Sequence, residues 1–173
     1  MKNGVIYLWV FFLVTGLAGC KNNTSKAPDK DGFAFKEIYD ARADSEADIA
    51  AAIARAGVQQ KRILLVFGGN WCPWCQRLHH LFENDEEIKR FLAAHYELVM
   101  IDLGRRDHNL AIDAKYGHPN KLGLPALVVL ESDGTPLCSQ ETGALEFPKE
   151  HPLKGHDPEK VLTFLETWAR PKA

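Results

Sequence analysis

The pair Cys72 and Cys75 constrains this chain more than any other feature. Two cysteines separated by two residues form the spacing of a redox dithiol. An apolar, strand-like run at residues 63–67 precedes the pair, and a helix-like pattern at residues 76–82 follows it. We therefore predict an active site at the point where this strand passes into this helix.

The residues inside the pair predict that the two thiols differ. Pro73 suits the first position of a helix, because its φ is fixed and it has no N–H, and this makes Cys72 the N-cap residue. Free backbone donors and the positive end of the helix dipole then favour the Cys72 thiolate. We expect Cys72 to be exposed and to attack, and Cys75, nearly one turn later and more sheltered, to resolve the mixed disulfide.

Two other roles for a cysteine pair at this spacing are a structural zinc site and a structural disulfide. A structural zinc site of this type needs a second pair of ligands at similar spacing, which the remaining cysteines, Cys20 and Cys138, do not form. A purely structural disulfide suits an exported protein, but flanking tryptophans and a helix N-terminus favour a reactive pair. We expect neither a bound metal nor a cofactor.

A second motif lies downstream, where Gly123-Leu124-Pro125 precedes the apolar run at residues 126–130. With residues 66–75, it resembles the two hallmarks of thioredoxin-fold proteins: the strand, turn and active-site helix, and a proline in cis that faces the cysteine pair. The resemblance covers residues 33–168 and includes the C-terminal domain of the thiol electron transporter DsbD and its single-domain relatives. It implies an α/β thioredoxin fold, with a central mixed β-sheet flanked by helices, and thiol–disulfide oxidoreductase activity.

The resemblance also implies how partners bind. A partner polypeptide is expected to lie against Trp71, Pro73, Trp74, Leu124 and Pro125. The expected partners are exported proteins that carry thiols or disulfides, and a membrane or periplasmic redox protein that recharges the dithiol. The dipeptide between the cysteines is more like the Pro-aromatic of glutaredoxins than thioredoxin's Gly-Pro, and it leaves the direction of electron flow open.

One position departs from the thioredoxin pattern. Typical thioredoxins carry a buried carboxylate six residues before the first cysteine, where it helps the second cysteine exchange its proton, and here that residue is Val66. Loss of this acid is expected to slow Cys75. His79, one helical turn after Cys75, is a candidate substitute, although a surface or core histidine is the simpler interpretation.

The N-terminus has the pattern of a lipoprotein leader. A positive start, an apolar run at residues 5–14 and small residues before Cys20 predict a signal peptide at residues 1–19, since that run is too short to span about 30 Å of hydrocarbon. The end of the leader resembles the lipobox of bacterial lipoproteins, in which Cys20 is lipidated; ordinary cleavage nearby is the alternative. The protein is then anchored in the cell envelope, and Lys21 permits transport to the periplasmic side of the outer membrane if the source is Gram-negative.

The rest of the chain is predicted to form a tether and one domain. Residues 20–32 are polar and suit a flexible tether, and residues 33–173 have the size of a single domain with a good core. The composition, 46% hydrophobic and 25% charged, is ordinary for a globular protein. A formal net charge of −2 offers no electrostatic footprint for nucleic acid.

Periodicity and capping signals predict the elements of this domain. The expected helices span residues 45–56, stopped by Gly57, then 73–82, 86–94, 109–116, and a last one that starts at Asp157. The expected strands span residues 62–67, 97–102, 126–130 and 137–142, the last two forming a hairpin.

Other residues with reactive side chains are scattered. Cys138 is interpreted as a small packed residue, with a regulatory thiol as the alternative. Four histidines, His108, His118, His151 and His156, fall in loops where solvated surface is the default. A copper site built from the cysteine pair and one of them is a minor hypothesis, and the competing function is a binding or copper-handling module without redox turnover.

Overall fold

The computed structural model describes residues 33–170. The predicted leader, Cys20 and the whole of the predicted tether therefore lie outside the described residues. Within this range, no helix combines the length and the apolar character needed to cross a membrane.

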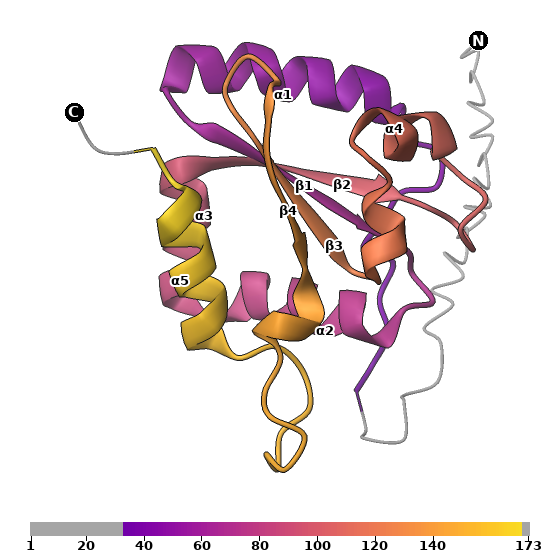
Figure 1. Cartoon of the computed structure of the whole chain (residues 1–173), viewed down its shortest axis with the longest axis vertical. Coiled ribbons are helices and arrows are strands. Elements are labelled where there is room, and N and C mark those ends of the chain that lie inside the picture. The colour runs from indigo at the N-terminus through magenta and orange to yellow at the C-terminus, as the bar shows by residue number, and fades with distance from the viewer. Residues whose placement is uncertain (1–32, 171–173) are drawn as a thin grey trace, which may run out of the picture.

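A four-stranded mixed sheet forms the centre of the domain (Figure 1), in the order β2-β1-β3-β4. β1 (Arg62–Gly68) runs parallel to β2 (Tyr96–Asp102) and antiparallel to β3 (Ala126–Leu130), which pairs with β4 (Pro136–Glu141). β1 and β3 are buried nearly throughout, which explains their continuous apolar sequences.

Helices cover both faces of the sheet (Figure 1). α1 (Ser45–Gln59) and α4 (Leu110–Lys115) pack on one face, and α2 (Pro73–Asn84), α3 (Glu86–His95) and α5 (Pro158–Trp168) pack on the other. Short 3-10 turns, η1 (Pro119–Leu122) and η2 (Thr142–Leu145), precede β3 and follow β4. This architecture confirms the predicted α/β thioredoxin fold.

The alternation of side chains along β1 divides the core. Ile63, Leu65 and Phe67 pack toward α1 and α4, whereas Leu64 and Val66 pack toward α2, α3 and α5. All five are buried. The strand that leads into the cysteine pair is therefore fixed from both sides.

The predicted end of the first helix was wrong. Gly57 does not stop α1, which continues to Gln59 and ends where Gln60 adopts a left-handed conformation (φ 56°) and donates its N–H to the Ala56 carbonyl. A Cβ at Gly57 would meet no atom within 4 Å, so this glycine serves no close contact. A glycine inside a helix costs only about 1 kcal/mol, which the packing of α1 on the sheet outweighs.

The sheet register brings the two sequence motifs together. β1 ends at Gly68, just before the cysteine pair, and its Phe67 pairs with Ala126, the first residue of β3. Because β1 and β3 are antiparallel, the end of one lies beside the start of the other. The loop that carries Pro125 therefore meets the start of α2 at one edge of the sheet.

The division of the core predicts a large difference between two truncations. Leu65→Ala removes a fully buried side chain from β1, and we expect the free energy of unfolding to fall by about 2–5 kcal/mol. Val58→Ala, on the exposed side of α1 at 86% exposure, should change it by less than about 0.5 kcal/mol. Denaturant titrations measure both, and equal losses for the two variants would contradict the assigned core.

Candidate active site

Cys72 occupies the N-cap of α2, as the sequence predicts. Its φ and ψ are extended, Pro73 follows at the first helical position, and the Cys72 sulfur accepts a hydrogen bond from the Cys75 backbone N–H at 3.2 Å. The sulfur thus takes the place of the oxygen in an ordinary N-cap residue, where an anion gains most from the helix dipole.

Both cysteines of the pair are free thiols and both are buried, so the expected exposure of Cys72 was wrong. Cys72 is 3% exposed and Cys75 is 1% exposed. The cause is a small cluster of side chains that packs around the pair, formed with Tyr39, Ile38, Trp71, Trp74, Met100 and Leu124. Little of the Cys72 side chain is therefore open to a partner disulfide.

The environment separates the two thiols electrostatically. A hydrogen bond from the Cys75 thiol lowers the pKa of Cys72. The N–H groups of Cys75 and Trp74 and the charge of Arg106 lower it further, and together these effects outweigh burial, which raises it. Burial raises the pKa of Cys75 far above its ordinary value, and the hydrogen bond to Cys72 and the Cys72 charge raise it further. The pair therefore holds its negative charge on Cys72.

The second motif lies opposite the first. The Leu124–Pro125 peptide bond is cis, and the Leu124 carbonyl lies 3.6 Å from the Cys72 sulfur and accepts its hydrogen bond. The Thr142 hydroxyl donates to the Pro125 carbonyl at 2.7 Å and fixes the loop from the far side. The structure thus brings Leu124 into contact with the pair and places Pro125 beside it in the chain.

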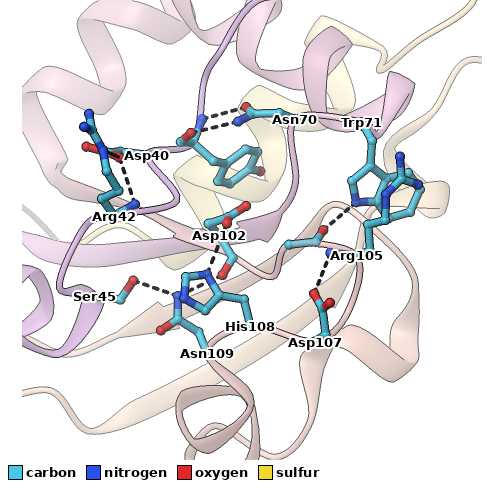
Figure 2. Close-up of polar contacts among 12 residues, drawn as sticks. Asp40, Arg42, Ser45, Asn70, Trp71, Asp102, Arg105, Asp107, His108 and Asn109 are labelled. Atoms are coloured by element: carbon cyan, nitrogen blue, oxygen red, sulfur yellow. Dashed lines mark hydrogen bonds and ion pairs between the residues drawn. The ribbon is translucent and has the colours of Figure 1, made fainter.

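The two tryptophans of the motif are half-buried at the rim of the site. The Trp71 indole N–H donates to the Gly104 carbonyl, and Figure 2 shows it turned toward the loop that follows β2. The Trp74 ring meets the edge of His156 at 6.0 Å between centroids, and the Arg77 guanidinium lies 5.7 Å from the Trp74 centroid. These contacts fix an aromatic rim around the cysteines.

Two amides that the sequence analysis did not single out tie the N-terminal segment to the site. Asn70 accepts from the backbone N–H groups of Ile38 and Tyr39 at 2.8 and 2.9 Å. It also donates back to the Tyr39 carbonyl at 2.8 Å, so that its amide makes two hydrogen bonds to the Tyr39 backbone (Figure 2). Gln76, which is buried, exchanges hydrogen bonds with the backbone of Lys36 in both directions. Segment 36–39 is therefore held against both ends of the cysteine motif.

The position of the missing acid is apolar, and the candidate substitute faces elsewhere. Val66 is buried in the core beneath α2, α3 and α5. His79 Nδ1 lies 3.5 Å from the Glu83 carboxylate, one turn further along α2, and burial lowers the pKa of His79. The carboxylate that His79 meets is thus Glu83, so the structure favours the simpler interpretation of this histidine.

One of the four loop histidines was misplaced by the sequence analysis. His156 is only 4% exposed, and neither of its ring nitrogens has a hydrogen-bond partner among the described residues. Burial lowers the pKa of His156 to about 4, so its ring is neutral near pH 7 and packs on Trp74. No local pattern signals this burial, because it depends on the long loop between η2 and α5 folding back over α2.

The other histidines have separate environments. His108 Nδ1 lies 3.3 Å from the Asp102 carboxylate, His118 Nδ1 lies 3.0 Å from Asp113, and the His151 ring stacks on Phe147. Within residues 33–170, no three histidine, cysteine or acidic side chains converge in a way that could hold a metal ion. The copper hypothesis therefore finds no third ligand in the described part of the chain.

Cys138 lies in β4, half-buried against the core beneath α5. Burial raises the pKa of Cys138, which disfavours the reactive thiolate. These features agree with the interpretation of Cys138 as a packed residue.

Comparison with known proteins agrees with this fold and this cysteine pair. A thioredoxin-like family model matches residues 44–132. The crystal structure of a protein from Xylella fastidiosa described as a disulphide isomerase shares 32% sequence identity, covers 76% of this chain and 96% of its own, and superposes with a TM-score of 0.66. No curated protein sequence is a significant match.

The C-terminal domain of DsbD from Neisseria meningitidis resembles this chain in fold alone. Its oxidised form shares 21% identity with a TM-score of 0.52, and its reduced form shares 20% with a TM-score of 0.52. Each comparison covers 73% of this chain and 97% of the Neisseria domain. With its family match, its mixed sheet and a close pair of unequal thiols of the kind found in thiol–disulfide oxidoreductases, the chain belongs to the thioredoxin-like family.

Proposed function

We propose that the protein is a membrane-anchored, extracytoplasmic thiol–disulfide oxidoreductase that exchanges disulfides with exported proteins. The observation that carries this proposal is the inequality of the two thiols at the start of α2. The pKa of Cys72 is lowered and the pKa of Cys75 is raised, although the two residues lie within one helical turn. Disulfide exchange needs one thiol that is readily ionised and attacks the partner, and a second, protonated thiol that later resolves the mixed disulfide.

In the first step, the Cys72 thiolate attacks one sulfur of a partner disulfide. A bond forms between the Cys72 sulfur and that partner sulfur, the partner's own S–S bond breaks, and its second sulfur leaves as a thiolate. The N–H groups at the start of α2 favour the Cys72 thiolate before the attack and also when Cys72 later leaves as a thiolate.

In the second step, the Cys75 thiol loses its proton and attacks Cys72. The new bond joins Cys72 and Cys75, the bond between Cys72 and the partner breaks, and the partner leaves as a thiolate that takes up a proton from solvent. The partner disulfide is reduced to two thiols while the dithiol is oxidised. The reverse sequence transfers a disulfide to a reduced partner.

The surface that receives the partner is formed by the two motifs together. Trp71 and Trp74 supply an aromatic rim, Pro73 lies between the cysteines, and the loop with Leu124 and Pro125 lies opposite. We expect an extended partner strand to lie between the rim and this loop. Apolar contact with the rim places the partner disulfide over the Cys72 sulfur.

The cellular setting of the proposal rests on the sequence. A signal peptide at residues 1–19, lipidation at Cys20 and a polar tether would hold the domain outside the cytoplasm, where protein disulfides form. The periplasmic side of the outer membrane is the proposed location in a Gram-negative source. The description of the Xylella fastidiosa protein as a disulphide isomerase supports protein disulfides as substrates. A membrane or periplasmic redox protein would recharge the dithiol.

The assignment of roles to the cysteines predicts unequal trapping. Cys75→Ser leaves the attacking thiol in place but removes the resolving one, so we expect mixed disulfides with partners to accumulate. Cys72→Ser removes the nucleophile and should trap none. The measurement is a non-reducing gel of acid-quenched membranes from each variant, compared with the same samples after reduction.

Two outcomes would count against this function. Trapping by Cys72→Ser and not by Cys75→Ser would reverse the roles. If neither variant traps a partner, and the purified wild-type protein neither reduces insulin nor forms disulfides in a reduced substrate, the binding-module hypothesis replaces the oxidoreductase.

The proposed anchor predicts a separate effect of Cys20. Cys20→Ser should abolish metabolic lipid labelling and detergent-phase partitioning, because the acylated thiol is lost, while insulin reduction by the purified domain is unchanged. Cys138→Ser is the matched control, since this cysteine packs within the domain and should leave labelling intact. Unchanged detergent-phase partitioning of Cys20→Ser would refute the anchor.

A further inference from the structure

The Tyr39 hydroxyl is a buried polar group without a hydrogen-bond partner in the described part of the chain. Tyr39 is 3% exposed, and its ring packs in the cluster around Cys72 and Cys75. A buried hydroxyl that lacks a partner destabilises a fold. Phenylalanine would fill the same space without that cost, so the hydroxyl calls for a functional explanation.

The backbone of Tyr39 is held in place by residues of the cysteine motif. Asn70 makes hydrogen bonds to the N–H and to the carbonyl of Tyr39, at 2.9 and 2.8 Å. Gln76, directly after Cys75, holds Lys36 through its backbone at 3.0 and 2.6 Å. The phenol is thus fixed relative to the active-site helix.

The hydroxyl lies beside the sulfur of Cys75. A Cβ placed on Gly68 would stand 2.2 Å from the Tyr39 oxygen and 2.7 Å from the Cys75 sulfur, so both atoms crowd the same face of this glycine. Gly68 ends β1, and any side chain there would displace the phenol or the thiol. The bare backbone at Gly68 is what permits the contact between Tyr39 and Cys75.

The phenol keeps its proton in this environment. Burial raises the pKa of Tyr39 well above its ordinary value, and the charges of Cys75, Cys72 and the buried Asp102, together with the contact between the phenol and the Cys75 sulfur, act in the same direction. In the reduced protein the Cys75 thiol directs its hydrogen at Cys72, and a neutral sulfur is a weak acceptor. A thiolate at Cys75 would be a strong acceptor for the waiting O–H.

We propose that Tyr39 is a catalytic residue that donates a hydrogen bond to the Cys75 sulfur as that sulfur becomes a thiolate and resolves the mixed disulfide. It supplies, from the N-terminal segment, assistance to Cys75 that the apolar Val66 does not give. The inference rests on the proposed function and adds a residue to its second step.

The proposed step leaves Tyr39 chemically unchanged. The Cys75 proton passes to solvent, the phenol O–H turns to the resulting thiolate, and the thiolate forms its bond to the Cys72 sulfur while the partner sulfur leaves with the electrons of the broken bond. Once Cys75 is part of the disulfide, the strong acceptor is gone. The hydroxyl therefore stabilises the reacting thiolate more than either end state.

The test uses dithiobis-nitrobenzoate, an aromatic disulfide that releases a yellow thiolate. Cys138 is a third free thiol that would add its own signal, so every protein in this test carries Cys138→Ser. With the reduced, purified protein in stopped flow, the first yellow phase then reports attack by Cys72 and the second reports resolution by Cys75. The Tyr39→Phe variant should keep the rate of the first phase within about twofold of the wild-type rate. Because the thiolate loses a hydrogen bond, the pKa that governs the rate of the second phase should rise by about one unit. Below that pKa, the fraction of Cys75 present as thiolate then falls about tenfold. Each thiolate is more basic and therefore attacks about threefold faster, so the second phase slows by about three- to fourfold overall.

The pH profile separates catalysis from structure. In the mixed disulfide, the Cys72 charge and the hydrogen bond to the Cys72 sulfur no longer raise the pKa of Cys75, so Cys75 ionises at lower pH than it does in the reduced protein. Tyr39→Phe should displace the second-phase profile toward higher pH, so that its deficit is present near neutrality and shrinks as Cys75 ionises in alkali. The charged groups that face the phenol, Cys72 and Asp102, are the same in both proteins. A loosened site would instead slow the second phase equally at every pH.

A second tyrosine provides the matched control. The Tyr96 hydroxyl is also buried, but it donates to the Leu165 carbonyl at 2.7 Å, and Tyr96 lies outside the cluster around Cys72 and Cys75. Tyr96→Phe should lower the melting temperature and leave both yellow phases unchanged. Tyr39→Phe should leave the melting temperature unchanged or raise it, because the lost hydroxyl has no partner.

The outcomes distinguish this inference from the proposed function. If the wild-type protein shows both phases and Tyr39→Phe matches it in rate and in pH profile, the role of Tyr39 is refuted while the oxidoreductase stands. If Tyr39→Phe slows both phases equally or lowers the melting temperature as Tyr96→Phe does, the residue is structural and the inference is overturned. If the wild-type protein shows no second phase, resolution by Cys75 fails, and the inference fails with it.

Discussion

The cap that the Cys72 sulfur makes on α2 is the interaction on which the rest of the site depends. The reaction requires the Cys72 sulfur to be negative, and this sulfur is also the acceptor for the N–H groups at the start of α2. The same contact therefore orders the helix and favours the thiolate. Pro73 supports it by starting the helix without an unsatisfied N–H. Burial of Cys75 one turn away then keeps the second thiol protonated, and the two cysteines become chemically distinct.

The N-terminal segment completes this arrangement. Asn70 and Gln76 stand on either side of the cysteines and hold segment 36–39 through its backbone, which brings Tyr39 to Cys75. The segment has no regular secondary structure. Its backbone N–H and C=O groups therefore find hydrogen-bond partners in side-chain amides, whereas those of a strand find them in the neighbouring strand. An apolar core under α2 and a phenol from outside the sheet together define the environment of the resolving thiol.

Local signals allowed most of the fold to be predicted from the sequence, and long-range contacts account for what was missed. The position of Pro73 follows from a short motif, and β1 and β3 follow from continuous apolar runs. The approach of the Pro125 loop was implied by the resemblance to thioredoxin-fold proteins. The end predicted at Gly57 failed because helix packing outweighs the weak propensity of one glycine. Tyr39 and His156 could not be placed, because each reaches the site from a segment without periodicity.

The central claim is that the helix cap and burial separate the ionisation of the two thiols. The most direct measurement is alkylation of the reduced protein with iodoacetamide across roughly pH 5 to 10, with each cysteine quantified by peptide mass spectrometry. We predict that the midpoint for Cys72 lies below the ordinary thiol value of about 8.5 and that Cys75 stays unmodified to far higher pH. A midpoint for Cys75 at or below that of Cys72 would contradict the account.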